Sequence, residues 1–199
     1  MGYNMTAHHH DHDNEIRSKV VFGFWVYLMT DAIMFGSLFA TYAVLHNNTY
    51  GGPGIQSIMS LPHVLIQTLV VLFSCLTYGL GYVSLLKGNK GGLTLWLLVT
   101  FVLGLAFLTM QYNEYACILA GGHSWQSSAF FSSYFTMTGV YGLHIIAGLI
   151  WILVLLVQLL MQGTTSTMNT RFTCLGLYWN YLNIIWIFIF TIVYLMGAI

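Results

Sequence analysis

The feature that most constrains this chain is a series of five apolar segments, each long enough to cross a membrane as a helix. A helix needs about 20 apolar residues to span a hydrocarbon core of roughly 30 Å. Hydrophobic residues make up 58% of the 199 residues and charged residues only 5%, too few charges to cover a soluble domain of this size. The sequence predicts an all-α integral membrane protein, a bundle of five transmembrane helices. The spans are expected at approximately 20–45, 62–86, 93–115, 129–160 and 172–198.

Short polar stretches rich in Gly and Asn separate the spans, and the basic residues predict the orientation. All the Lys and Arg residues precede the first span or lie in the second–third or fourth–fifth connection: Arg17, Lys19, Lys87, Lys90 and Arg171. In a five-span chain these positions fall on one side of the membrane, and short cytoplasmic loops carry the excess of basic residues. We therefore expect the N-terminus inside and the C-terminus outside (N-in/C-out).

Residues 1–19 form a polar, His-rich tail that precedes the membrane domain at 20–199. His and carboxylate side chains can bind divalent cations, but nothing in the stretch HHHDHDNE fixes a ligand geometry. We interpret the tail as a solvated, disordered cytoplasmic arm. The cysteines, Cys75, Cys117 and Cys174, lack metal-ligand spacing, and we expect them to pack as small apolar side chains.

Two carboxylates lie within or beside the apolar spans. Asp31 falls about 11 residues into the first span, which places it roughly 16 Å deep and near the middle of the bilayer. A carboxylate that faced lipid there would be costly, so we expect Asp31 to face the bundle and to be hydrogen-bonded or protonated. Glu114 lies at the outer end of the third span, where it is either an ordinary surface carboxylate or a functional group.

His144 lies deep in an apolar run, where a histidine commonly binds a haem or metal or passes a proton. A haem held by two imidazoles needs a second histidine at similar depth on another span. No other histidine qualifies, because His46 and His63 lie at span ends, His123 lies in a loop, and the others lie in the tail. We therefore expect this chain to bind no haem, copper or other metal by itself.

Polar and small residues elsewhere in the spans predict helix packing. Asn180 and Asn183 are three residues apart and share a helix face, and amides within a membrane usually join helices. No nucleophile–His–Asp arrangement, nucleotide-binding loop or helical metal-ligand pair occurs at credible depth, so no catalytic residue is expected. Small residues are expected to permit close helix contacts at Gly36, Ala40, Gly142 and Gly148.

Five stretches, taken together, resemble a known family. They are FGFWVYLMTDAIMFGSLFATYAVL at 22–45, QYNEYA, YGLHIIAG, TSTMNTRFTCLGLYW and IIWIFIFTIVYLMGA, in that order. From about residue 20 to its end the chain resembles subunit III of cytochrome o-type ubiquinol oxidases, within the haem–copper oxidase subunit III family. The five spans fit the quinol-oxidase branch, because the cytochrome c oxidase version typically has seven.

This resemblance implies a function and a set of partners. It implies a non-catalytic subunit III of a proton-pumping haem–copper terminal ubiquinol oxidase of the aerobic respiratory chain, in the bacterial cytoplasmic (inner) membrane. Family members pack beside subunit I, bind phospholipid in a cleft and are thought to support proton uptake. The haems and copper belong to subunit I, ubiquinol is the substrate of the complex, and subunits II and IV are further partners. No nucleic acid is expected.

The resemblance also singles out individual residues. Asp31 matches a position where the family carries Asp or Glu, Glu114 matches the Glu of its EY motif, and His144 matches the second His of its HGLH motif. The chain departs from the family where Tyr141 replaces the first His of HGLH.

It departs again where Asn180 and Asn183 replace the His and Asp of the family's WHxxD. None of the three replacements titrates near neutral pH, so we expect no proton relay through them. We expect His144 to be a buried neutral imidazole that joins helices through Tyr141 or an asparagine.

Alternative functions are subunit III of a cytochrome c oxidase, an independent small membrane transporter and, less favoured, a free-standing membrane enzyme. Transporters commonly show internal repeats and helices broken near the membrane midplane. Here Pro53 lies in a loop and Pro62 at a span edge, and no repeat is visible. The sequence therefore favours the oxidase subunit over the transporter.

Overall fold

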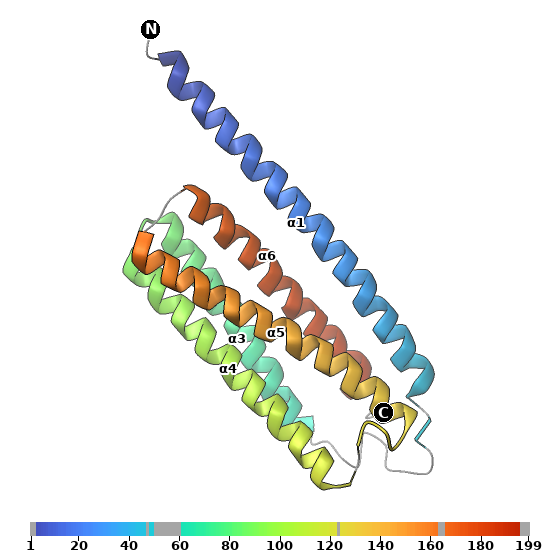
Figure 1. Cartoon of the computed structure of the whole chain (residues 1–199). Helices are drawn as coiled ribbons and strands as arrows, with labels where there is room; N and C mark the ends of the chain where they lie inside the picture. Colours follow the sequence, from blue (N-terminus) through green and yellow to red (C-terminus); the bar gives the residue numbers. More distant parts are fainter. Residues whose placement is uncertain (1–2, 47, 50–60, 123, 163–165, 196–199) are drawn as a thin grey trace.

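A computed structural model shows five long helices that form one elongated bundle (Figure 1). It describes residues 3–46, 48–49, 61–122, 124–162 and 166–195. Each of five helices is long and apolar enough to cross a membrane, and these described residues contain no strand, so the predicted all-α fold with five spans is confirmed. The elements are α1 (Tyr3–Leu45), α3 (Leu61–Leu86), α4 (Lys90–Ala120), α5 (Ala129–Gln162), α6 (Ser166–Ile189) and the π-helical turn η1 (Phe190–Leu195).

Glycine and asparagine end the helices where the sequence predicts breaks. Gly88 follows α3 with φ +71°, and Gly122 follows α4 with φ +80°, a conformation that residues with a side chain rarely adopt. Asn89 caps α4, because its side-chain oxygen accepts a hydrogen bond from the Gly92 N–H at 3.2 Å. The predicted end of the fifth span, residues 196–198, lies outside the described residues.

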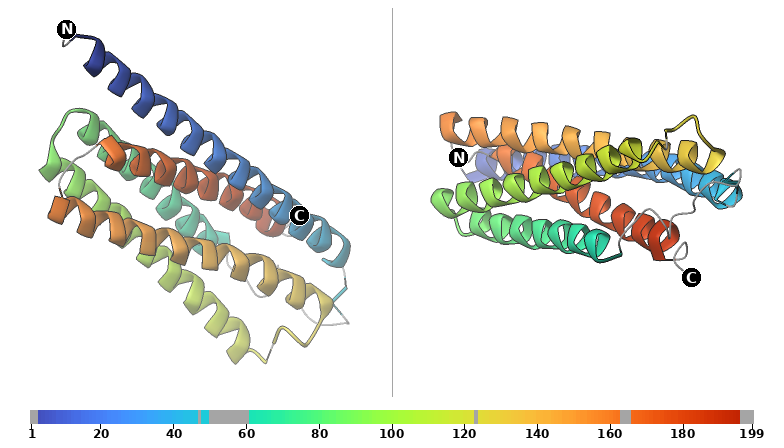
Figure 2. Two further views of the ribbon diagram at one scale, coloured as in Figure 1. Left: turned by 45° about the horizontal axis from the view of Figure 1, so that its top comes forward. Right: turned by 90° about the horizontal axis from the view of Figure 1, so that it is seen from below.

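The helices α3 and α4 form an antiparallel hairpin, and α5 and α6 pack against it (Figure 2). The helix α1 lies across α5 and α6, and its N-terminal turns extend beyond the ends of the other helices (Figure 1). The α3–α4 turn, the end of α5 and the start of α6 all lie at one end of the bundle. Four of the basic residues lie near these points: Arg17, Lys87, Lys90 and Arg171. The orientation relative to the membrane stays a prediction.

The helix α1 begins within the polar tail, so the expectation that the tail is disordered was wrong. The backbone is helical from Tyr3 onward, without a break before the first span. Neither Gly nor Pro occurs between Tyr3 and Phe22. Extending an existing helix adds one hydrogen bond for each residue that is fixed, without a new nucleation step. The apolar first span therefore provides a start from which the helix continues into the tail.

The core is dominated by large aromatic side chains. Trp179 and Trp186 of α6 are almost fully buried, and they pack against residues of α4 and α5. Large apolar side chains also cover the outside of the bundle: Ile33 is 74% exposed and Leu160 is 69% exposed. An apolar exterior of this kind suits a bilayer, in which the exposed side chains contact lipid or other membrane subunits.

Two glycines allow close contact between α4, α5 and α6. A Cβ atom added at Gly148 would lie 3.0 Å from Trp179 Cζ3, and one added at Gly104 would lie 2.6 Å from Leu149 Cδ2. The predicted packing role of Gly148 is thus confirmed. The same prediction was wrong for Gly36 and Gly142, where an added Cβ would meet nothing within 4 Å. Both glycines point away from the neighbouring helices of the described bundle.

Candidate functional site

Asp31 and His144 meet between α1 and α5, although 113 residues separate them in the sequence. The Nε2 atom of His144 lies 3.1 Å from Asp31 Oδ1, and the Asp31 side chain is 8% exposed. The other ring nitrogen, Nδ1, lies 2.8 Å from the carbonyl oxygen of Val140. The Phe35 ring packs edge-on against the imidazole. Asp31 therefore faces the bundle, and its partner comes from another helix.

The two hydrogen bonds of His144 determine how many protons the pair holds. A carbonyl oxygen can only accept, so Nδ1 must carry a proton and donate it to Val140. A hydrogen bond between Nε2 and Oδ1 then needs one further proton, which belongs either to the imidazole or to the carboxyl group. The pair has no net charge in either case, which lowers the cost of placing it within a membrane.

Tyrosines of α6 complete the surroundings of the pair. The hydroxyl of Tyr178 donates a hydrogen bond of 2.9 Å to the backbone oxygen of His144. Tyr181 lies close enough to Asp31 for an electrostatic interaction. Both the Tyr181 hydroxyl and Asp31 Oδ2 are buried. The pair is thus enclosed by α1, α5 and α6.

The structure differs from the expected partners of His144. The imidazole bonds to Asp31 and not to Tyr141 or an asparagine. The Tyr141 hydroxyl is buried without a hydrogen-bond partner in the described part of the chain, and its ring packs against Phe107 and Trp186. The Tyr141 ring faces the core between α4 and α6, whereas the His144 imidazole faces α1.

Both predicted asparagines lie on the side of α6 that faces α3. Asn180 Oδ1 accepts a hydrogen bond of 2.8 Å from the thiol of Cys75, a residue that the sequence indicated only as a packing cysteine. Asn183 is buried, and its Nδ2 donates to the backbone oxygen of Trp179 at 2.8 Å. The described cysteines are free thiols.

Glu114 forms a second buried polar cluster. Its side chain is 8% exposed, so it is not an ordinary surface carboxylate. Gln67 of α3 donates to its Oε2 at 3.0 Å, whereas Tyr134 of α5 and Tyr194 of η1 donate to its Oε1 at 2.9 and 3.1 Å. Gln111, one turn earlier on α4, is also buried, and its side chain interacts with the hydroxyl of Tyr115.

Sequence reasoning missed the partners of Glu114. Gln67 is the amide that interrupts an otherwise apolar stretch of its span, and that contrast is a signal that could have identified it. Tyr134 and Tyr194 gave no such signal, because tyrosines are frequent in this chain. The four elements α3, α4, α5 and η1 meet at this carboxylate.

Among the side chains that the structure describes, no three His, Cys, Asp or Glu residues lie close enough together to hold a metal ion. The side chains of residues 1–14, which include the tail histidines, lie outside the described set, as does His123.

Comparisons with known proteins agree with this architecture. The family model described as cytochrome c oxidase subunit III matches residues 3–198. The chain is 51% identical to the cytochrome bo(3) ubiquinol oxidase subunit 3 of Pseudomonas aeruginosa, over 97% of this chain and 92% of the relative. It is 35% identical to the quinol oxidase subunit 3 of Bacillus spizizenii, over 94% and 92%. It is also 35% identical to the cytochrome c oxidase subunit 3 of Bacillus sp. strain PS3, over 89% and 86%. The chain therefore belongs to the cytochrome c oxidase subunit III family and is a subunit III of a haem–copper oxidase.

Proposed function

We propose that this chain is the non-catalytic subunit III of a proton-pumping ubiquinol oxidase in a bacterial inner membrane. The observation that carries the proposal is the 51% identity, over nearly the whole chain, to a subunit named for ubiquinol oxidation. Its main contact is subunit I, which holds the haems and copper, and subunits II and IV are further neighbours. The apolar exterior of the bundle supports such contacts, because a membrane subunit needs a wide surface for lipid and partner helices.

An accessory role fits the chemistry of the described polar groups. Asp31 bonds to His144, and Glu114 bonds to Gln67 and two tyrosines. Both carboxylates therefore find hydrogen-bond partners on other helices of this chain. The hydrogen bond between Asp31 and His144 joins a carboxyl group and an imidazole within the membrane span. We propose that the pair supports proton uptake by subunit I through its effect on the local electrostatics, without itself taking part in oxygen reduction.

We propose that phospholipid occupies an open groove between α1, α5 and α6. The groove has a volume of about 330 Å³ and is lined by Phe24, Tyr27, Ala147, Trp151 and Tyr178. Its mainly aromatic and apolar lining suits an acyl chain. Arg17 lies on α1 about two turns before Phe24, where its guanidinium could bond to a lipid phosphate. Phospholipid retained after gentle purification should decrease when Trp151 is replaced by Ala.

The proposed function is tested by deleting the chain from the oxidase that contains it. The complex without the chain should keep its haem spectrum and should begin to oxidise ubiquinol at a near-normal rate. It should then lose activity sooner during turnover and take up protons more slowly. Loss of the haem spectrum together with retained subunits, or a haem band in the isolated chain, would contradict a non-catalytic role.

The electron donor needs a separate measurement, because one relative is named as a cytochrome c oxidase subunit. The intact complex should oxidise a short-chain ubiquinol and should be inactive with reduced cytochrome c. Activity with reduced cytochrome c alone would favour the other branch of the family.

A further inference from the structure

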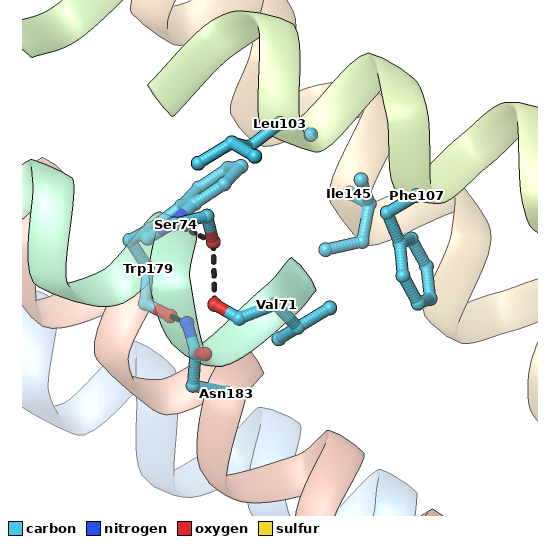
Figure 3. Close-up of a pocket in the computed structure, with 8 residues that line it drawn as sticks. Val71, Ser74, Leu103, Phe107, Ile145, Trp179 and Asn183 are labelled. Atoms are coloured by element: carbon cyan, nitrogen blue, oxygen red, sulfur yellow. Dashed lines mark hydrogen bonds between the residues drawn. The ribbon is translucent and has the colours of Figure 1, made fainter. Parts of the chain in front are cut away.

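A small cavity lies in the core where α3, α4, α5 and α6 meet (Figure 3). The volume within which the centre of a water-sized sphere can move is about 10 Å³. A cavity needs roughly 10–15 Å³ on this measure to hold one water molecule, so there is room for one and for nothing larger. The lining combines apolar and polar side chains, which include Val71, Ser74, Leu103, Phe107, Ile145 and Asn183.

One polar atom on this lining has no partner. Asn183 is 6% exposed, and its Nδ2 donates to the backbone oxygen of Trp179. Its side-chain oxygen, Oδ1, has no hydrogen-bond partner among the residues that the structure describes. An amide oxygen that is buried without a donor is costly, and ordered water is the usual partner for such an atom.

Ser74, on the facing helix α3, has one acceptor position left. Its hydroxyl donates to the backbone oxygen of Val71 at 2.6 Å and accepts from the indole N–H of Trp179 at 3.1 Å (Figure 3). A hydroxyl oxygen has two lone pairs, so the second can accept another hydrogen bond. A water molecule has two O–H groups, which matches the two acceptors that line the cavity.

We propose that one buried water molecule binds in this cavity and donates hydrogen bonds to Asn183 Oδ1 and Ser74 Oγ. The water closes a circuit of hydrogen bonds around Trp179, because Asn183 bonds to the backbone of that residue and Ser74 bonds to its indole. Trp179 is the residue that packs against Gly104 of α4 and Gly148 of α5. The water therefore fixes the side chain on which the contact between α4, α5 and α6 depends.

The direct test is a cryo-electron microscopy map of the complete oxidase, at a resolution that shows other ordered waters inside its membrane domain. A single peak should lie within hydrogen-bond distance of both Asn183 Oδ1 and Ser74 Oγ. The peak should be absent from the Asn183→Leu complex and present in the Asn180→Leu complex, because Asn180 is an exposed residue that bonds to Cys75 and does not line the cavity. A wild-type map with ordered waters elsewhere and no peak here would overturn the proposal.

A second test uses the sign of a stability change. Val71→Ile adds one methylene to a residue that lines the cavity. If the cavity holds water, the methylene displaces it and leaves Asn183 Oδ1 unpaired. The detergent-solubilised complex should then lose this chain at a lower temperature, so the midpoint temperature for retention of the chain should fall. If the cavity is empty, filling it should raise the midpoint. The control, Val70→Ile, changes a neighbouring residue outside the lining and should leave the midpoint unchanged. An unchanged or higher midpoint for Val71→Ile would overturn the proposal.

Discussion

At the residue scale, one proton lies between His144 Nε2 and Asp31 Oδ1, because the other ring nitrogen, Nδ1, donates its own proton to the Val140 carbonyl oxygen. This arrangement keeps two titratable groups within a membrane span without a net charge. It also makes each residue dependent on the other, because removal of one partner leaves the other without this hydrogen bond within the membrane span. The pair thus links α1 to α5 by chemistry as well as by packing.

Replacement of Asp31 should distinguish hydrogen bonding from charge. In Asp31→Asn the amide N–H can donate a hydrogen bond to the Nε2 atom of a neutral His144. The chain should therefore assemble normally with the haems intact. Asp31→Leu leaves Nε2 unpaired, which should weaken retention of the chain by about 1–3 kcal/mol. The double replacement Asp31→Leu/His144→Leu should recover part of the loss, because no buried polar group remains alone. The midpoint temperature for retention in the complex measures all three, and additive effects would argue against direct coupling.

Glu114 makes a similar prediction with more partners. Glu114→Leu removes the acceptor for Gln67, Tyr134 and Tyr194, although the two tyrosine hydroxyls, 3.0 Å apart, can still bond to each other. The expected cost is about 1–3 kcal/mol for each donor left without an acceptor. Glu114→Gln should be milder, because its oxygen can still accept from the tyrosines. Equal effects of Leu and Gln on the retention midpoint would show that charge outweighs hydrogen bonding here.

At the element scale, the helices touch where glycines allow it. Trp179 and Tyr178 of α6 pack closely against Gly148, whereas Gly142, on the same helix α5, faces open space in the described bundle. The two positions form a matched pair within one element. A methyl group can be added at both with the same gain in helix propensity, and only one of them meets a neighbour.

Gly148→Ala should therefore destabilise the bundle, by about 1–3 kcal/mol if the aromatic rings cannot move. Gly142→Ala should be neutral or slightly stabilising, because alanine is the better helix former. Unfolding of the chain in detergent, followed by tryptophan fluorescence, measures the difference. A loss at Gly142 equal to that at Gly148 would point to a partner subunit that contacts Gly142 in the complex.

The helices were far more predictable from the sequence than the contacts between their side chains. Hydropathy, together with Gly and Asn at the breaks, predicted the five spans because membrane thickness sets helix length. The Asp31–His144 bond depends on how α1 crosses α5, and no local pattern encodes a crossing. The contact of Tyr194 with Glu114 depends on the π-helical register of η1, which a helical period of 3.6 does not reveal.

The polar extension of α1 also makes a prediction at this scale. Its N-terminal turns extend beyond the other helices (Figure 1), so they bury little surface within this chain. Deletion of residues 2–13 should leave assembly and turnover nearly unchanged. Co-purification of the other subunits with the shortened chain measures assembly. Loss of the assembled complex would show that the tail helix binds another subunit.

At the scale of the whole molecule, charge is distributed very unevenly. The bundle is apolar around its circumference, and all five Lys and Arg residues lie outside or at the ends of the apolar spans. The α3–α4 turn carries Lys87 and Lys90, whereas the α4–α5 connection at the opposite end carries no Lys or Arg. Such an asymmetry favours one orientation in the membrane, with the basic end in the cytoplasm.

The N-in/C-out orientation can be measured by thiol labelling of intact cells. In a variant whose three native cysteines are replaced by Ala, a cysteine is introduced at either Lys87 or Gln126, which lie at opposite ends of the bundle in the α3–α4 and α4–α5 connections. Once the outer membrane is permeable to a membrane-impermeant maleimide, Gln126→Cys should react, whereas Lys87→Cys should react only after the inner membrane is broken. The physical reason is that transfer of Lys87 and Lys90 across the membrane during insertion is disfavoured. The α4–α5 connection has no basic residue that would keep it in the cytoplasm. Reaction of Lys87→Cys in intact cells, with Gln126→Cys protected, would establish the inverted orientation.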